Sequence, residues 1–343
     1  MLPPIMKKEL EKQGYRIVGK NEHSAVKTCG WTKSMIRGEG GCYKFKFYGI
    51  RSHQCMQMTT SMSCANRCEF CWRDYKAPVS KEWKGGIDDP VELIDGSLEA
   101  HQKLLYGFKG SAKANKVFVD QALKDVKHVA LSLTGEPITY PRINEMIAEF
   151  HQRKISTFLV TNAQYPEAIK NLAPVTQLYA SVDAPNKELL KEIDKPLFSD
   201  FWERFLKSLD YLSEKEGRTV IRLTLVKERN MCDLEGYAQL ITRGDPDFIE
   251  VKGYMSAGAS EERLGFSYVP THEEVKAFGL ALVKHLPAYE YVSEHVPSVV
   301  ILLAKKSFQK KTWIDFDKFF QDNHSLCPQA PTQEQRTLLP VLS

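Results

Sequence analysis

Apolar runs alternate with amphipathic stretches along most of this chain. Six runs rich in β-branched, leucine and aromatic residues predict strands at 57–62, 127–133, 156–161, 177–184, 219–227 and 247–253. Amphipathic patterns between these runs predict helices at about 91–108, 141–153, 165–172, 199–215 and 234–243. Continuous apolar strands that alternate with helices indicate parallel pairing, with the helices outside the sheet.

The number of strands narrows the architecture. Because eight strands close a full parallel barrel, six predict an α/β fold with an open, partial six-strand parallel β/α barrel. A flat, doubly wound sheet is the alternative. We expect one compact unit in three parts: an N-terminal extension (1–56), the barrel core (57–255) and a C-terminal cap with an irregular tail (256–343). Within the cap, a helix is predicted at 271–286 and strands near 290–304.

The composition is that of a globular protein. Of the 343 residues, 43% are apolar and 26% are charged, and no run of 18 or more apolar residues is present. The N-terminal segment lacks the apolar core of a signal peptide, so we expect a cytoplasmic protein without a membrane span. Because thiols stay reduced in the cytoplasm, the eight cysteines indicate metal binding or catalysis rather than disulfides.

Positive charge is concentrated near the N-terminus. Residues 1–60 carry eleven Lys and Arg against four Glu, whereas the whole chain has a net charge of only +4. Such a segment suits contact with RNA phosphates; a solvated lysine-rich edge, or an amphipathic strand over 43–49 with its aromatic residues in the core, is the alternative. The candidates for RNA contact are Trp31, Lys33, Arg37, Tyr43, Lys44, Phe45, Lys46, Phe47, Tyr48, Arg51, Trp72, Arg73 and Lys76.

Three cysteines, Cys64, Cys68 and Cys71, follow the first predicted strand in one short loop. A structural zinc site needs four ligands, usually from two pairs of cysteines, and this triplet has no partner pair nearby. An iron–sulfur cube held by three thiolates leaves one iron open to a small molecule with an amine and a carboxylate. A zinc loop or three buried thiols is the alternative.

The pattern C-x3-C-x-aromatic-C, here with Phe70 before Cys71, resembles the signature of the radical S-adenosylmethionine (SAM) superfamily. The resemblance implies a [4Fe–4S] cluster whose open iron binds the amine and carboxylate of SAM. It further implies reductive cleavage of SAM to a 5′-deoxyadenosyl radical that abstracts a hydrogen atom. The core of that superfamily is also a six-strand partial barrel.

Later strand ends carry polar residues in the order that this superfamily shows. The segment TGEP after the second predicted strand resembles the GGEP motif, whose Glu meets the SAM amine, although a threonine replaces the first glycine. Two further strand ends could contact the SAM carboxylate and ribose, or could simply cap loops. The resulting candidates for SAM binding are Phe70, Thr134, Gly135, Glu136, Pro137, Asn162, Ser181 and Asp183.

A second set of cysteines, Cys29, Cys42 and Cys55, precedes the triplet at intervals of 13 residues. The spacing belongs to no general metal motif. It leaves open scattered structural thiols, a zinc site completed by His23 or His53, or a second three-coordinate iron–sulfur cube.

Together the two cysteine sets and TGEP resemble the tRNA 4-demethylwyosine synthase family in its archaeal form, over about residues 25–310. The resemblance implies that the second set holds an auxiliary [4Fe–4S] cluster that seats pyruvate. It also implies a carbon–carbon lyase that condenses pyruvate with N1-methylguanosine at position 37 in the anticodon loop of tRNA-Phe. We expect a monomer with an external electron donor, since the chain leaves no room for a flavodoxin-like domain. Another radical SAM enzyme that modifies RNA or a peptide, or a zinc-stabilised RNA-binding protein, is the alternative.

A lysine next to the second set is the candidate for covalent catalysis. Lys44 lies two residues after Cys42, and an amine with a lowered pKa forms a Schiff base with a ketone. The family resemblance implies that role for Lys44. Lys46 is its rival, because both side chains would face the same way on a strand. No role is assigned to Cys232 or Cys327.

Overall fold

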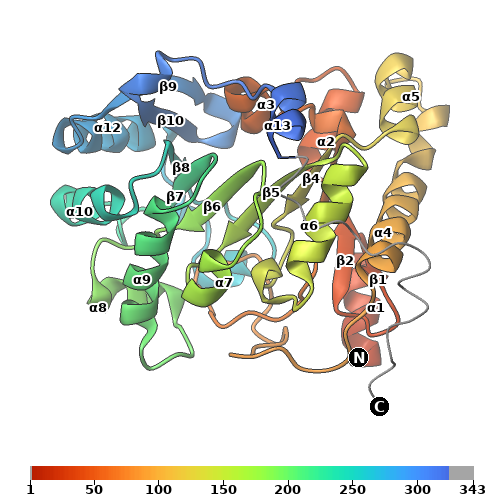
Figure 1. Cartoon of the computed structure of the whole chain (residues 1–343), viewed down its shortest axis with the longest axis horizontal. Coiled ribbons are helices and arrows are strands. Elements are labelled where there is room, and N and C mark those ends of the chain that lie inside the picture. The colour runs from red at the N-terminus through yellow and green to blue at the C-terminus, as the bar shows by residue number, and fades with distance from the viewer. Residues whose placement is uncertain (1, 324–343) are drawn as a thin grey trace.

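The computed structural model describes residues 2–323, which form a curved, open sheet of ten strands (Figure 1). The strand order is β1-β2-β3-β4-β5-β6-β7-β8-β10-β9, and the six neighbours from β3 to β8 are all parallel. The strands are β1 (Tyr15–Val18), β2 (Ser24–Lys27), β3 (Cys55–Thr59), β4 (His128–Leu131), β5 (Ser156–Thr161), β6 (Gln177–Ser181), β7 (Thr219–Leu225), β8 (Phe248–Gly253), β9 (Tyr289–His295) and β10 (Val300–Lys305). The six predicted strands and the partial barrel are therefore confirmed.

Both edges of the sheet differ from the prediction. The strands β1 and β2 form an antiparallel hairpin that pairs with β3, although no strand was predicted there. At the other edge, β10 pairs antiparallel with β8, so the strands predicted as part of a cap instead continue the sheet. Each is only four to seven residues long, and such short runs carry little periodicity.

Helices cover the convex face of the sheet, where they bury the main hydrophobic core (Figure 1). Each parallel crossover needs such a helix, because its apolar stripe must pack on the sheet. These helices are α4 (Pro90–Leu105), α6 (Ile143–Gln152), α7 (Pro166–Lys170), α9 (Phe201–Ser213), α10 (Leu234–Gly244) and α12 (His272–Leu282). The remaining helices are α1 (Pro4–Lys12), α2 (Gly30–Ile36), α3 (Tyr43–Tyr48), α5 (Lys116–Lys124), α8 (Lys187–Asp194), α11 (Ser260–Arg263) and α13 (Phe316–Asp322).

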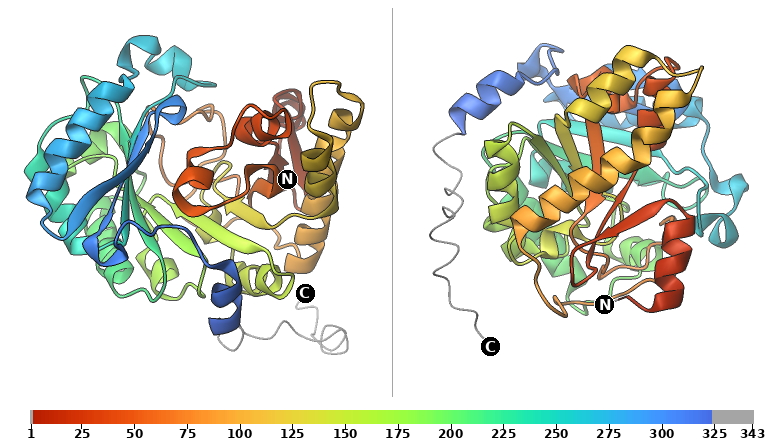
Figure 2. Two further views of the ribbon diagram at one scale, coloured as in Figure 1. Left: turned by 90° about the horizontal axis from the view of Figure 1, so that it is seen from above. Right: turned by 90° about the vertical axis from the view of Figure 1, so that its right-hand side faces the viewer.

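The short helix α3 packs against the concave face of the sheet, inside the arc (Figure 2, left). The alternating run 43–49 is thus helical, and its interpretation as a strand was wrong. Tyr43, Phe47 and Tyr48 lie on one helical face and are buried against residues of β5 to β8 and β10. The helix ends at Gly49, whose φ of 79° is the left-handed conformation that glycine adopts readily.

Two predictions concern the ends of the chain. No helix among residues 2–323 is long and apolar enough to cross a membrane. The irregular tail that was predicted after residue 326, including Cys327, lies outside the described residues.

Candidate active site

The cysteine triplet lies at the carboxyl edge of the parallel strands, in the loop that follows β3. The loop docks on the end of α8: the Arg67 N–H donates to the Asp194 carbonyl at 3.0 Å, and the Glu69 N–H donates to the Ile193 carbonyl at 2.9 Å. Within the loop, the Cys71 N–H donates to the Cys68 carbonyl at 3.2 Å. The loop is therefore held by backbone hydrogen bonds, both within the loop and to the end of α8.

The three cysteines are half-buried and lie near one another. Burial raises the pKa of Cys64 to about 12 and the pKa of Cys68 well above its usual value, and the neighbouring thiols raise both further. Two N–H donors reach Cys64 Sγ at 3.4 Å, from the Asn66 backbone and from Asn162 Nδ2. Buried thiols ionise when a metal centre compensates the charge, and N–H donors to sulfur are typical around iron–sulfur clusters. The site fits a cluster.

Gly135 brings the TGEP segment against the cysteine loop. Its φ is 65°, and a Cβ atom at this position would lie 1.9 Å from the Ser61 carbonyl oxygen. Only glycine permits both the conformation and this approach. As a result, the Glu136 N–H donates to the Ser63 carbonyl at 2.8 Å. The neighbouring Thr134 and Pro137 are also buried.

Glu136 points an unsatisfied oxygen into this site. The side chain is 2% exposed, and its Oε2 accepts the Asn162 backbone N–H at 2.9 Å. The other oxygen, Oε1, has no hydrogen-bond partner among residues 2–323. Burial raises the pKa of Glu136 to about 7. A buried carboxylate oxygen without a donor is costly, so the site is suited to a ligand that supplies one, such as an amine.

Asn162, Ser181 and Asp183 also lie at the carboxyl edge, after β5 and at the end of β6. Asp183 Oδ1 accepts the Thr224 N–H at 3.1 Å, and burial raises the pKa of its carboxyl to about 6. Ser181 is partly exposed and pairs in register with Arg222 of β7. The structure therefore brings these three side chains to the same edge as the cysteine loop, in which Phe70 is half-buried.

The second cysteine set gathers at the opposite edge of the strands. Cys29 precedes α2, Cys42 immediately precedes α3, and Cys55 begins β3. Burial raises the pKa of the Cys55 thiol, and Cys42 and Cys29 raise it further because they lie nearby. The Ser52 hydroxyl donates to Cys42 Sγ at 3.3 Å. Since β3 rises ~3.3 Å per residue, its five residues separate the two edges by about 13 Å.

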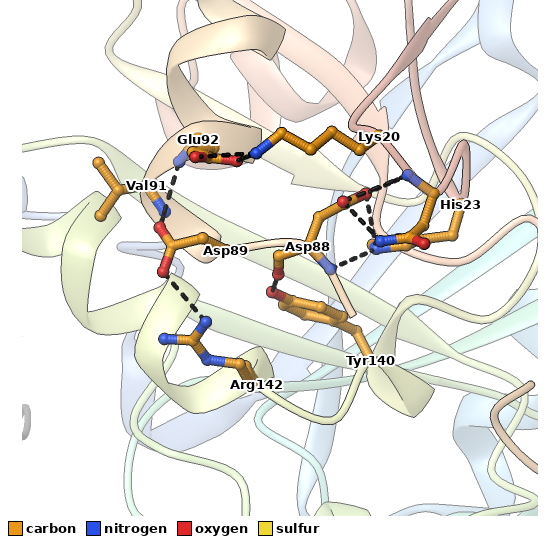
Figure 3. Close-up of polar contacts among 9 residues, drawn as sticks. Lys20, His23, Asp88, Asp89, Val91, Glu92, Tyr140 and Arg142 are labelled. Carbon is orange, nitrogen blue, oxygen red and sulfur yellow. Dashed lines mark hydrogen bonds and ion pairs between the residues drawn. The ribbon is translucent and has the colours of Figure 1, made fainter. Parts of the chain in front are cut away.

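Neither histidine proposed as a fourth ligand joins this set. His23 Nδ1 lies 2.8 Å from the Thr60 carbonyl oxygen, and its Nε2 lies 3.2 Å from Asp88 Oδ2 (Figure 3). His53 Nε2 lies 2.8 Å from Gln121 Oε1. Within residues 2–323, no group of three or more His, Cys, Asp or Glu is arranged to hold a single metal ion. The alternative of a zinc site completed by His23 or His53 is therefore not supported.

The polar contacts of His23 instead tie the N-terminal hairpin to the start of the cysteine loop. The Met62 N–H donates to the His23 carbonyl at 3.0 Å, and the Tyr140 hydroxyl donates to the Asp88 carbonyl at 2.6 Å (Figure 3). Asp88 also accepts the Asn21 N–H at 3.1 Å. This network joins both flanks of the loop to the turn between β1 and β2 and to Tyr140, which follows the TGEP segment.

The helical conformation of α3 separates the two candidate lysines. The Lys44 ammonium lies 4.0 Å from the centroid of the Tyr179 ring, on the concave face of the sheet. Burial lowers the pKa of Lys44. Of the nearby charged residues, Glu250 raises this pKa and Arg222 lowers it further. Lys46 is exposed on another face of the helix. Of the two lysines, the geometry therefore places only Lys44 beside Cys42 and Cys55.

Sequence analysis missed a set of charged residues on the concave face. Alternate residues of a strand share a face, so Glu250 and Lys252 of β8 point the same way as Arg222 of the neighbouring β7. Glu250 is fully buried and accepts the Tyr43 and Tyr48 hydroxyls, both at 3.0 Å. Burial lowers the pKa of Lys252 to about 8. Charged residues at alternate positions of an apolar strand were the available signal.

The structure also sorts the candidates for RNA contact. The three aromatic residues of α3 that lie in the core, Tyr43, Phe47 and Tyr48, are inaccessible to RNA, so this part of the expectation was wrong. Arg73 is turned inward, where its guanidinium donates to three carbonyls of the cysteine loop. The candidates that remain exposed are Lys33, Arg37, Lys46, Arg51, Trp72 and Lys76.

Two family models match the chain. Residues 58–241 match the Radical SAM superfamily, and residues 243–305 match a family described as wyosine base formation. The first range contains the cysteine triplet and the TGEP segment. The second contains β8, α11, α12 and both C-terminal strands.

Curated relatives share about half of the residues. An S-adenosyl-L-methionine-dependent tRNA 4-demethylwyosine synthase of Oryza sativa subsp. japonica is 51% identical over 328 residues, which are 94% of this chain and 50% of that protein. The synthase TYW1 of Homo sapiens is 51% identical over 324 residues, which are 93% of this chain and 44% of that protein. The chain thus spans about half the length of these relatives.

Two solved structures match over almost their whole length. A structure of TYW1 with a lysine-pyruvate adduct bound is 34% identical, with a TM-score of 0.80, and the match covers 92% of this chain and 99% of that chain. A crystal structure of archaeal TYW1 is 32% identical, with a TM-score of 0.73, and the match covers 90% and 98% of the two chains.

Proposed function

Because the chain belongs to the radical SAM superfamily and, within it, to the tRNA 4-demethylwyosine synthase family, we propose that it makes the tricyclic base 4-demethylwyosine. It would condense pyruvate with N1-methylguanosine at position 37 of tRNA-Phe, as a radical SAM carbon–carbon lyase. The observation that carries this proposal is Lys44, which lies buried on the concave face near Cys42 and Cys55. A TYW1 structure that matches this chain holds a lysine-pyruvate adduct.

Membership of the superfamily implies SAM and a [4Fe–4S] cluster. When bound, the cluster and SAM supply reductive cleavage of the sulfonium and thereby a carbon radical that takes a hydrogen atom from the substrate. Cys64, Cys68 and Cys71 hold the cluster in this proposal. In this proposal, Glu136 Oε1 accepts a hydrogen bond from the SAM amine. Asn162 holds Glu136 and Cys64 next to each other, because its backbone N–H donates to Glu136 and its Nδ2 donates to Cys64 Sγ.

The second set, Cys29, Cys42 and Cys55, holds an auxiliary [4Fe–4S] cluster in this proposal. These three thiols lie near one another, and neither His23 nor His53 joins them, so a cluster there would keep one iron available to the carboxylate of an α-keto acid. Lys44 attacks the keto carbon of pyruvate; its nitrogen bonds to that carbon and the carbonyl oxygen leaves as water. Burial favours the neutral, nucleophilic amine, because it lowers the pKa of Lys44.

The concave face between the two edges is the space in which the reactants meet. The methyl carbon of the guanosine must approach both SAM and pyruvate, so the base has to leave its stack and enter this space. The strands that line it carry polar side chains, among them Ser181, Arg222 and Lys252. Their hydrogen-bonding groups orient a nucleobase better than an apolar wall would.

We place the protein in the cytoplasm, as a monomer of three parts (1–56, 57–255 and 256–343) that takes electrons from an external donor. Exposed cations of the N-terminal part, such as Lys33 and Arg37, would contact tRNA phosphates. About eight iron atoms per chain are expected for two cubane clusters.

The proposal is tested by an anaerobic assay with tRNA that carries N1-methylguanosine, SAM and carbon-labelled pyruvate. Because the bond between carbons 1 and 2 of pyruvate breaks and the carboxyl carbon leaves, we expect fully labelled pyruvate to give a nucleoside whose mass reports two labelled carbons in the base. A radical SAM enzyme of another kind would release 5′-deoxyadenosine without pyruvate label in the tRNA, and this result would overturn the proposal.

Two variants separate the lysines in the same assay. Lys44→Ala should abolish the labelled product, and borohydride should no longer trap pyruvate on the protein. Lys46→Ala is the matched control, because Lys46 lies on the same helix with its side chain exposed. Product formation by Lys44→Ala at the normal rate would remove the covalent step from the proposal.

A further inference from the structure

Two arginines, Arg73 and Arg263, donate hydrogen bonds to backbone carbonyls of the cysteine loop. Arg73, in the loop itself, donates from Nη1 to the Met62 carbonyl at 3.1 Å and to the Pro78 carbonyl at 3.0 Å. Its Nη2 donates to the Asn66 carbonyl at 3.2 Å. One guanidinium thereby joins the backbone before Cys64, the turn after it and the chain beyond the triplet. A lysine would have no planar fork with which to reach three carbonyls.

Arg263 approaches the other half of the loop from α11. Its Nε donates to the Glu69 carbonyl at 3.0 Å, and its Nη2 donates to the Cys71 carbonyl. Next to it, the Ala259 N–H donates to the Trp72 carbonyl at 3.0 Å. Arg263 lies in the range that matches the wyosine family, whereas the loop lies in the range that matches the radical SAM superfamily. The two parts of the chain meet at the cluster loop.

Both guanidiniums bring positive charge to a site that otherwise contains carboxyl groups. Glu136, Asp183 and Asp194 are buried nearby, and Asn66 Nδ2 of the loop donates to Asp194 Oδ2 at 3.4 Å. The loop's own carboxylate, Glu69, is paired with Lys195 at 3.1 Å and Arg229 at 3.0 Å.

We propose that Arg73 and Arg263 are positioning residues for the SAM-binding cluster, which hold its loop in shape and make the cluster easier to reduce. The reduced cluster carries one more negative charge than the oxidised cluster, so a nearby positive charge stabilises the reduced form. The hydrogen bonds to loop carbonyls fix the three thiolates at the spacing that the cluster needs. This inference rests on the proposed function only in assigning the cluster to Cys64, Cys68 and Cys71.

The test is a redox titration of the anaerobically reconstituted full chain, in which electron paramagnetic resonance follows the signal that SAM changes. Arg73→Met and Arg263→Met should each move the midpoint to lower potential. A tenfold change in the reduction equilibrium corresponds to ~59 mV for a one-electron couple, and we expect a shift of that order for Arg73→Met. Arg243→Met is the matched control, because Arg243 pairs with Asp210 on the outer helices and should leave the midpoint unchanged.

Lysine variants separate the effect of the positive charge from the effect of the planar guanidinium group, which donates several hydrogen bonds at once. Arg73→Lys and Arg263→Lys keep the positive charge, so the midpoint should stay near that of the wild type while the iron content per chain falls. If the methionine variants bind no iron at all, the role of charge is tested by the lysine variants. A midpoint of the lysine variants at lower potential than that of the wild type would overturn the role of charge. Methionine variants with full iron content and an unchanged midpoint would overturn the whole inference.

Failure of the inference differs from failure of the proposed function. If SAM changes no signal of the wild-type protein, the cluster assignment itself is wrong. If the wild type responds to SAM and the arginine variants match it in midpoint and iron content, only the inference is wrong.

Discussion

The two cysteine sets differ in how the chain builds them. Cys64, Cys68 and Cys71 come from one loop, held by its own backbone, by α8 and by two arginines. Cys29, Cys42 and Cys55 come from three separate segments, which meet only because α2 and α3 pack near the start of β3. The first site is therefore local in sequence, and the second depends on the tertiary fold. Changes in packing should damage the second site before the first.

The largest effect that separates the two sets is expected from Cys68→Ala. Two cysteines cannot hold the cluster with the open iron that SAM needs, so release of 5′-deoxyadenosine should fall below detection. Chromatography of the anaerobic reaction measures it. Cys232→Ala is the control, because Cys232 is exposed and should release 5′-deoxyadenosine at the wild-type rate. Release by Cys68→Ala would show that the triplet is not the SAM site.

The corresponding change in the second set, Cys42→Ala, should separate the cleavage of SAM from the formation of the tricyclic base. The SAM-binding edge lies about 13 Å away along β3, so 5′-deoxyadenosine release should persist while the tricyclic nucleoside disappears. The two products are measured in one incubation by mass spectrometry. Normal amounts of the tricyclic nucleoside from this variant would exclude the second set from the mechanism.

A change in packing should act on the second set alone. Glu250→Ala removes the acceptor of the Tyr43 and Tyr48 hydroxyls and leaves nearby positive charge without its buried partner. Loss of one partner of a buried charged group costs ~3–5 kcal/mol, so thermal unfolding should occur at lower temperature. Iron bound at the second set should fall, and trapping of pyruvate on Lys44 should fall with it.

Glu250→Gln should be less damaging than Glu250→Ala, because glutamine keeps the shape of the side chain and loses only its charge. Its melting temperature should lie between those of Glu250→Ala and the wild type. If Glu250→Ala lowered the iron content of both sets equally, the contrast between a local and a tertiary site would be wrong.

The smallest of these effects concerns SAM affinity and its dependence on pH. Glu136→Gln removes the charge that we propose faces the SAM amine, and a hydrogen bond to a charged group contributes ~1.5–3 kcal/mol, so binding should weaken about tenfold or more at pH 8. Burial raises the pKa of Glu136 to about 7, so below that pH the wild-type carboxyl is protonated and its advantage is lost. The affinities of wild type and variant should converge towards pH 6, as measured by equilibrium dialysis. A constant difference across this range would contradict the assignment.

The features that could be predicted from the sequence are those of the first, local cysteine set, and the features that could not are those that depend on the tertiary fold. The triplet, TGEP and the parallel strands are local patterns, so their spacing and periodicity were enough to place them. The course of β1 and β2 could not be predicted, because each has only four residues and the hairpin that they form is attached to the rest of the sheet through the pairing of β2 with β3.

The conformation of 43–48 shows why periodicity failed near the second set. Aromatic residues at 43, 45 and 47 fit a strand, but 43, 47 and 48 fit one face of a helix equally well. The partners that decide between them, such as Phe158, Tyr179 and Phe248, are more than a hundred residues away. The choice between Lys44 and Lys46, and the charged group around Glu250, therefore depended on tertiary structure.

The division of labour between the two sets is tested most directly by electron paramagnetic resonance of two dithionite-reduced variants, with and without SAM. One variant replaces all three cysteines of the first set by alanine, and the other replaces all three of the second set. We predict that SAM changes the spectrum only of the protein that retains Cys64, Cys68 and Cys71. A SAM-dependent change in the protein that lacks these three cysteines would contradict the account.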